Sequence, residues 1–259
     1  MQADGCHKRE WNRTIGGMKM EMTANNAILN TASKENKTDG RTPLQITIRE
    51  PGSAITHLLG MLLAIFGSVP LLIKAALGGG SYEFLAMSVF MISMILLYGA
   101  SATYHSVNLS GDALKIFKRM DHMMIFVLIA GSYTPTCMLV LEQPLGYRLL
   151  TIVWSIALLG MLFKFFWVTC PKWVSSILYI GMGWVVIFAV KPLYEALSLP
   201  AFLWLLAGGI VYTIGGVIYA LKLPLFNSIH KNFGSHEIFH LFVMGGSLCH
   251  YIFTYYFVA

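Results

Sequence analysis

The sequence predicts an all-α fold, a polytopic membrane protein built as a bundle of seven transmembrane helices. Of its 259 residues, 56% are hydrophobic and only 12% are charged, whereas soluble domains carry about 25% charged residues. The hydrophobic residues also form long blocks, each with about the 20 residues that a helix needs to cross a bilayer. The formal net charge of +6 is therefore interpreted as a signal of membrane topology rather than of nucleic-acid binding.

Seven apolar segments follow one another between residue 50 and the carboxy terminus. Turn-forming residues separate them, including a glycine run at 78–80, an Asn-Leu-Ser-Gly run at 108–111 and the prolines Pro144, Pro171 and Pro224. Small residues within the later segments are expected to allow close contact between helices. The predicted spans are 53–77, 84–107, 119–141, 146–168, 173–190, 199–221 and 235–258.

Residues 1–49 differ in composition from residues 50–259, which we predict to form the transmembrane domain. The first segment is rich in Asn, Thr, Lys and Glu and lacks an apolar core. We therefore expect a polar, disordered cytoplasmic tail rather than a cleavable signal peptide. The four cysteines have no paired spacing, so no disulfide framework is expected: Cys6, Cys137, Cys170 and Cys249.

Lysine and arginine residues predict the orientation, because short cytoplasmic loops carry an excess of both. The amino-terminal segment and the loops on its side carry fifteen such residues, against three on the opposite side. Without the tail the bias is seven against three, with Lys164 counted among the seven. We therefore expect the amino terminus in the cytoplasm and the carboxy terminus outside.

The seventh span begins with two histidines, His236 and His240. Four-residue spacing places both imidazoles on one face of a helix, about 6 Å apart, where both can reach a single cation. Polar ligands are costly inside a membrane, so such a pair is a candidate functional site. The spacing alone is common, and it needs support from other spans.

Span direction brings three further polar residues to the same depth. The second span ends on the cytoplasmic side with Ser101 and His105, and the third begins there with Asp121. Together with His236 and His240, they lie within about two turns of one membrane boundary. Residues from three helices are therefore expected to meet.

Three neutral imidazoles suit zinc, with a fourth position left for water. We expect His105, His236 and His240 to be the ligands, and zinc to activate the bound water as a nucleophile. Asp121 would act as general base or orient the water, and Ser101 would orient His105 or the water. The expected chemistry is hydrolysis of an amide or ester at the membrane–cytosol interface, with a lipid as the natural substrate.

Other polar residues near span ends are interpreted as interfacial. His122 is rotated about 100° from Asp121 on the helix, and His250 lies about 15 Å along the helix from His240. Glu237 is interpreted as a charge near a helix N-terminus. The histidines assigned to this interfacial group are His57, His122, His230 and His250.

The motifs resemble those of the haemolysin III family, within the progestin and adipoQ receptor superfamily of seven-span membrane proteins. The resemblance runs from Glu50 to the end of the chain and excludes the tail. Its carriers are Ile-Thr-His-Leu-Leu-Gly at 55–60, Ser-Ala-Thr-Tyr-His at 101–105, Met-Asp-His at 120–122, Gly-Ser-Tyr-Thr-Pro at 131–135 and Ser-His-Glu-Ile-Phe-His at 235–240.

The resemblance implies a zinc ion held by His105, His236 and His240, with Asp121 and Ser101 near its water. It also implies a cytosolic amino terminus and a multi-pass location in the bacterial inner (plasma) membrane. Better-studied relatives have been linked to hydrolysis of lipid amides, which makes a zinc-dependent lipid hydrolase the leading expectation.

Two alternatives of other classes remain open: a cytolytic membrane protein, and a receptor or sensor with a structural zinc. A retinal protein is not expected, because the seventh span has no lysine for a Schiff base. The expected partners are membrane lipids and not nucleic acid. The substrate and the oligomeric state stay open.

Overall fold

A computed structural model describes residues 19–20, 23, 25–26, 48–78, 80–221 and 234–259. The chain divides into two units, Met1–Thr47 and Ile48–Ala259, and only the second is considered below. Most of the predicted tail and all of the 222–233 connection, with His230, lie outside the described residues.

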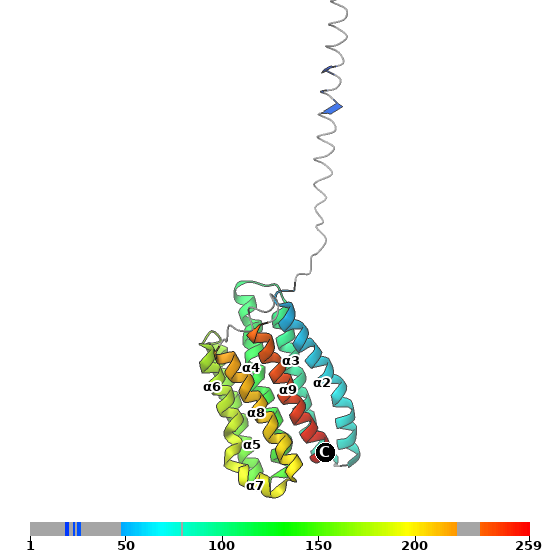
Figure 1. The fold of residues 1–259 in the computed structure, drawn as a ribbon, viewed down its shortest axis with the longest axis vertical. Helices are drawn as coiled ribbons and strands as arrows, with labels where there is room; N and C mark the ends of the chain where they lie inside the picture. Colours follow the sequence, from blue (N-terminus) through cyan, green and yellow to red (C-terminus); the bar gives the residue numbers. More distant parts are fainter. Residues whose placement is uncertain (1–18, 21–22, 24, 27–47, 79, 222–233) are drawn as a thin grey trace, which may run out of the picture. The chain divides into compact units, whose positions relative to one another are not determined.

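The unit Ile48–Ala259 is an all-helical bundle (Figure 1). Within its described residues, seven helical stretches are long and apolar enough to cross a membrane, which confirms the predicted fold class. The helices are α2 (Pro51–Gly78), α3 (Gly80–Ser106), α4 (Gly111–Pro135) with the π-helical η1 (Thr136–Val140), α5 (Leu145–Phe166), α6 (Lys172–Gly183) with the 3-10 helix η2 (Trp184–Ala189) and α7 (Val190–Ala196), α8 (Leu199–Leu221) and α9 (Ser235–Phe257).

Two helical boundaries differ from the predicted spans. α4 begins at Gly111 rather than at residue 119. Its first turns carry charged residues, among them Asp112 and Lys115, which suit a helix that extends beyond the apolar layer but hide its start from a hydropathy pattern. The fifth span continues to Ala196 and changes to 3-10 geometry at Trp184, so it is longer and less regular than predicted.

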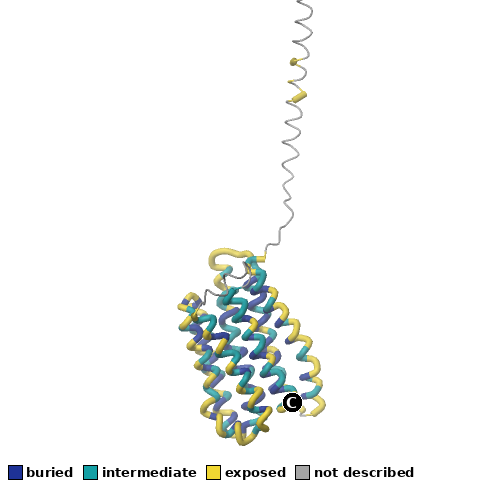
Figure 2. The backbone as a smooth tube through the Cα atoms, in the orientation of Figure 1, coloured by how far each residue is buried: buried dark blue, intermediate teal, exposed yellow. Residues whose placement is uncertain are grey.

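The helices pack around an interior that several of them line. α2 packs against α3 and α9, α3 against α4, and α8 against both α6 and α9, while α5 packs against α4. Buried residues face inward and exposed ones outward (Figure 2). The exposed surface is apolar, with Phe66 and Phe188 as examples, as expected of side chains that face lipid.

Glycines allow α8 and α9 to approach closely, as the sequence predicted. A Cβ atom at Gly246 would lie 2.6 Å from Cδ1 of Tyr212, and one at Gly208 would lie 2.7 Å from Nε2 of His250. Real Cβ atoms are essentially never that close to a neighbour. The two glycines therefore leave room for the aromatic and imidazole rings of the facing helix.

Lys164 does not belong to a loop, contrary to the charge count made from the sequence. It lies in the last turn of α5 and is fully buried. Its Nζ donates to the Ser175 hydroxyl at 2.5 Å and lies 3.1 Å from Sγ of Cys170. Its ammonium group therefore forms part of the contact between α5 and the start of α6.

Candidate metal centre

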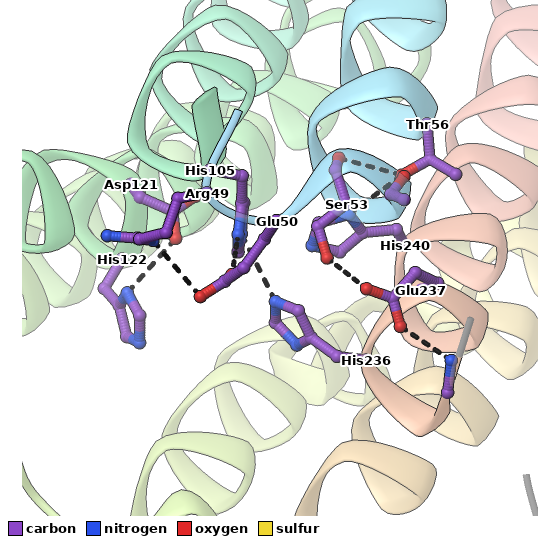
Figure 3. A network of polar contacts seen from close by, with 12 residues as sticks. Arg49, Glu50, Ser53, Thr56, His105, Asp121, His122, His236, Glu237 and His240 are labelled. Atoms are coloured by element: carbon purple, nitrogen blue, oxygen red, sulfur yellow. Dashed lines mark hydrogen bonds and ion pairs between the residues drawn. The ribbon is translucent and has the colours of Figure 1, made fainter. Parts of the chain in front are cut away.

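Three histidine side chains from two helices converge at one end of the bundle (Figure 3). His105 belongs to the last turn of α3, whereas His236 and His240 belong to the first turns of α9. One ring nitrogen of each lies within 4.8 Å of those of the other two. The structure therefore brings together the three histidines that the sequence predicted as ligands.

The spacing of these nitrogens suits a small cation. The Nε2 atoms of His105 and His236 are 3.3 Å apart. Two ligands of a tetrahedral zinc, each about 2.0–2.1 Å from the metal, lie about 3.3 Å apart. The rings of His236 and His240 are also close, with centroids 4.5 Å apart. The donor set is made of three imidazole rings, and imidazole nitrogen is a usual ligand of zinc.

His105 has a carboxylate partner on its other nitrogen. Glu50, which directly precedes α2, accepts a hydrogen bond from Nδ1 of His105, and its own backbone N–H donates to the His105 carbonyl at 3.0 Å. The hydrogen bond from His105 holds the pKa of Glu50 below its ordinary value. Sequence reasoning missed Glu50, although an acidic residue directly before the first apolar span was visible.

Arg49 contacts the same region. Its Nε lies 3.2 Å from Oε1 of Glu50, and its guanidinium carbon lies 4.2 Å from the centroid of the Tyr104 ring. Arg49 and Glu50 thus pair with Tyr104 and His105, two consecutive residues of α3. This double contact attaches the segment before α2 to the end of α3.

His240 is held by two side chains of α2. Its Nδ1 lies 3.1 Å from the hydroxyl oxygen of Thr56, and its ring stacks on that of His57 at 3.5 Å between centroids. His57 is buried, with 3% of its surface exposed, so its interpretation as an interfacial residue is wrong. The helix rotation that places Thr56 on His240 also turns His57 inward.

The start of α9 is tied to α2 through Glu237. Its Oε1 accepts a hydrogen bond from the Ser53 hydroxyl at 2.5 Å, and its Oε2 accepts one from the backbone N–H of Gly234 at 2.8 Å. The predicted charge at a helix N-terminus is therefore also a tether between helices. It fixes the turn that carries His236.

Asp121 and Ser101, the two predicted catalytic residues, border the same cavity as His236 and His240. Asp121 is buried, and its Oδ2 lies 3.3 Å from Nδ1 of His122. The prediction that His122 faces elsewhere is wrong, because both neighbours reach the broad cavity wall. Oγ of Ser101 is buried and has no hydrogen-bond partner among the described residues.

The cavity has a volume of about 390 Å³ and extends from His236 and His240 toward the other end of the bundle. Its wall is mostly apolar and includes Leu128 and Ile129 of α4, with Leu193 of α7 and Phe202 of α8 at its far end. His250 borders it at a deeper level than His240 and does not belong to the group of three, as predicted. It is buried, however, so its interpretation as an interfacial residue is wrong. The histidines thus stand at one end of a long apolar space.

Comparison with known proteins identifies the family of this chain. Residues 46–251 match the family described as haemolysin-III related. Hemolysin-3 of Bacillus cereus is 41% identical over 203 residues, which are 78% of this chain and 89% of that protein. The hemolysin-3 homolog of Bacillus subtilis strain 168 is 43% identical over 204 residues, 78% and 91% of the two chains.

A more distant relative is the adiponectin receptor protein of Drosophila melanogaster. It is 24% identical over 217 residues, which are 78% of this chain and 49% of that protein. The resemblance that the sequence motifs carried is confirmed by both levels of similarity. The chain belongs to the haemolysin III family of multi-pass integral membrane proteins, within the progestin and adipoQ receptor superfamily.

Proposed function

We propose that the protein is a zinc-dependent hydrolase that acts on an amide or ester bond of a lipid at the membrane interface. One observation carries the proposal: of three clustered imidazoles, those of His236 and His240 border an apolar cavity together with the buried carboxylate of Asp121. A concave apolar site with a few convergent polar groups is the usual form of a small-molecule site.

His105, His236 and His240 would hold the ion through neutral ring nitrogens and leave one position for water or substrate. Bound there, zinc would supply Lewis-acid activation of a water and of the carbonyl group that is cleaved. The three ligands come from α3 and α9, so closure of the site depends on how these two helices pack.

Asp121 is the proposed proton acceptor. Its carboxylate is buried beside His122, which restricts its orientation and leaves it facing the cavity. A general base must lie within hydrogen-bond reach of the proton it removes, and Asp121 borders the same space as two of the ligands. The hydroxyl of Ser101 is the proposed donor that orients the water, because it has no partner among the described residues.

The shape of the cavity supports a lipid as substrate. From His236 to His250 the wall extends about 20 Å along α9, compared with about 15 Å for half of a bilayer's hydrocarbon core. An acyl chain parallel to the helices would fit this length with its polar linkage at the histidines. The volume of about 390 Å³ falls within the usual range of small-molecule pockets, about 300–1,000 Å³.

We also propose that the histidine end faces the cytoplasm, in a bacterial inner membrane. The support is the excess of lysine and arginine in the segments and loops at that end. An external labelling reagent that modifies a cysteine introduced at Gly111, but not one introduced at Leu197, would contradict this orientation.

The test of the hydrolase proposal starts from the full-length protein purified in detergent. Zinc per chain is measured first, and release of fatty acid from a panel of lipid amides and esters is measured next. We expect one zinc per chain and turnover of at least one lipid class. A native chain that binds no zinc would remove the basis of the proposal. Zinc without turnover would favour a receptor or sensor with a structural zinc.

A second candidate function is membrane lysis, favoured by the name of the hemolysin-3 relative of Bacillus cereus. It requires that the protein make bilayers permeable. Release of an encapsulated dye from liposomes that contain the purified protein measures this directly. Liposomes that retain their dye at protein densities typical of a bacterial membrane would exclude lysis.

A further inference from the structure

We propose that the start of α2 sets the protonation pattern of two of the three clustered histidines. Glu50 and Thr56 act as positioning residues, which keep a proton on Nδ1 of His105 and of His240 and direct Nε2 of both rings to the ion. The inference rests on the proposed metal function. It adds residues that touch neither the substrate nor the ion.

Two hydrogen bonds join Glu50 to His105. The carboxylate of Glu50 accepts from Nδ1–H of His105, and the backbone N–H of Glu50 donates to the carbonyl of the same residue at 3.0 Å. A carboxylate that is ionised can only accept a hydrogen bond. The proton therefore stays on Nδ1, and Nε2, which faces His236 at 3.3 Å, carries the lone pair.

The second contact depends on where the hydroxyl hydrogen of Thr56 goes. The hydroxyl donates to the backbone carbonyls of Gly52 at 3.0 Å and Ser53 at 2.9 Å. A hydroxyl has one hydrogen, and in the proposed arrangement Thr56 donates it to a carbonyl of α2, so that its oxygen accepts from Nδ1 of His240, 3.1 Å away. His240 then also carries its proton on Nδ1.

A third side chain of the same segment supports the placement. Ser53 donates to Glu237 at 2.5 Å, and this glutamate also receives the backbone N–H of Gly234. Glu50, Ser53 and Thr56 are each three residues apart, so they share one face of the chain that enters α2. One face therefore contacts both α3 and α9, the two helices that supply the ligands (Figure 3).

These contacts could hold the helices together without affecting the histidine tautomers. The test must therefore determine which ring nitrogen carries the proton. We would label the histidines of the full-length protein with nitrogen-15 and strip it of metal. Nuclear magnetic resonance then shows which ring nitrogen carries the proton, with assignment from the single variants His105→Ala and His240→Ala. We expect the proton on Nδ1 of both residues in the native chain.

Matched substitutions separate orientation from mere attachment. Glu50→Ala and Thr56→Val remove the acceptors and should give a mixture of tautomers at His105 and His240, respectively. Glu50→Gln and Thr56→Ser keep an acceptor oxygen and should retain the native pattern. Thr103→Val is the control, since Thr103 is exposed and its hydroxyl bonds only to its own helix, at the carbonyl of Gly99.

Zinc affinity gives the second measurement. Loss of a group that orients a metal-bound histidine typically costs about 10–100-fold in affinity, so we expect this loss for Glu50→Ala and Thr56→Val and none for the control. A native chain with its protons on Nε2 would overturn the inference, as would zinc affinities unchanged in both variants. A native chain that binds no zinc, but has both protons on Nδ1, would instead overturn the proposed function.

Discussion

Among the buried polar side chains of this bundle, two clusters differ in how their atoms are satisfied. The lysine cluster consists of Lys164, Cys170 and Ser175. Its nitrogen, sulfur and oxygen atoms contact one another at 2.5–3.4 Å. None of the three borders the cavity. Each polar atom of this cluster therefore has a partner within the cluster.

The histidine cluster consists of His105, His236 and His240. Here the Nε2 atoms of two rings face each other at 3.3 Å. Two nitrogen lone pairs in this arrangement are unfavourable unless a proton or a cation lies between them. Buried atoms without partners among the described residues lie around it, including Oγ of Ser101 and both ring nitrogens of His57. Burial alone therefore does not indicate a functional site, whereas unsatisfied atoms around a cavity do.

The largest expected effect is the loss of metal from the histidine cluster. His240→Ala should lower zinc content from about one per chain to below about 0.1, because a three-ligand site does not survive removal of one ligand. Plasma mass spectrometry of the purified protein measures this. His250→Ala is the control, since His250 is buried in the same helix but lies outside the cluster. Equal zinc loss in both variants would show that the cluster is not the metal site.

Next in size is the effect of Asp121→Asn on lipid hydrolysis. We expect the rate to fall by at least about 100-fold while zinc content stays unchanged, because the amide cannot accept the proton. The control is Asp112→Asn in the same helix, whose side chain is 93% exposed and pairs with Lys115. A rate for Asp121→Asn within twofold of the native rate would exclude Asp121 as the base.

A substitution in the lysine cluster should lower the stability of the protein and leave its metal content unchanged. Lys164→Ala leaves Cys170 and Ser175 without their shared partner, and we expect a loss of about 1–3 kcal/mol in the free energy of unfolding. Unfolding of the protein in detergent by denaturant measures this. If zinc content fell as well, the two clusters would be coupled and the contrast between them would be wrong.

The smallest effect is expected at the surface. Lys115 pairs with Asp112 at 2.9 Å, and both side chains are more than half exposed. Exposed ion pairs contribute about 0–1 kcal/mol, so Lys115→Ala should change the free energy of unfolding by less than about 0.5 kcal/mol. A loss as large as that of Lys164→Ala would mean that burial does not distinguish these two lysines.

The features that the sequence predicted correctly depend on the position of a residue along its helix. Span order and direction were enough to bring His105, His236, His240 and Asp121 to one level of the bundle. Their level follows from 1.5 Å of rise per residue and needs no knowledge of packing. The boundaries of the sixth and seventh spans were likewise visible from hydropathy.

What the sequence did not predict depends on rotation about the helix axis. His57 and His122 were placed at the correct level but on the wrong face, because packing against neighbouring helices sets rotation. Glu50 and Thr56 were missed for the same reason. A contact between two helices leaves no periodic pattern in the sequence of either helix. Lys164 was counted as a loop charge because hydropathy does not show which polar residue has a buried partner.

The histidine cluster and the side chains around it join the first, second and last of the membrane-crossing helices described here. Thr56 belongs to α2, His105 to α3, and His236 and His240 to α9. A chain is synthesised from its amino terminus, and domains fold as they emerge. Until α9 is made, His105 has no partner ligand. Metal uptake at the proposed site would therefore follow the synthesis of α9, and a captured ion would distinguish a chain that contains α9 from one that does not.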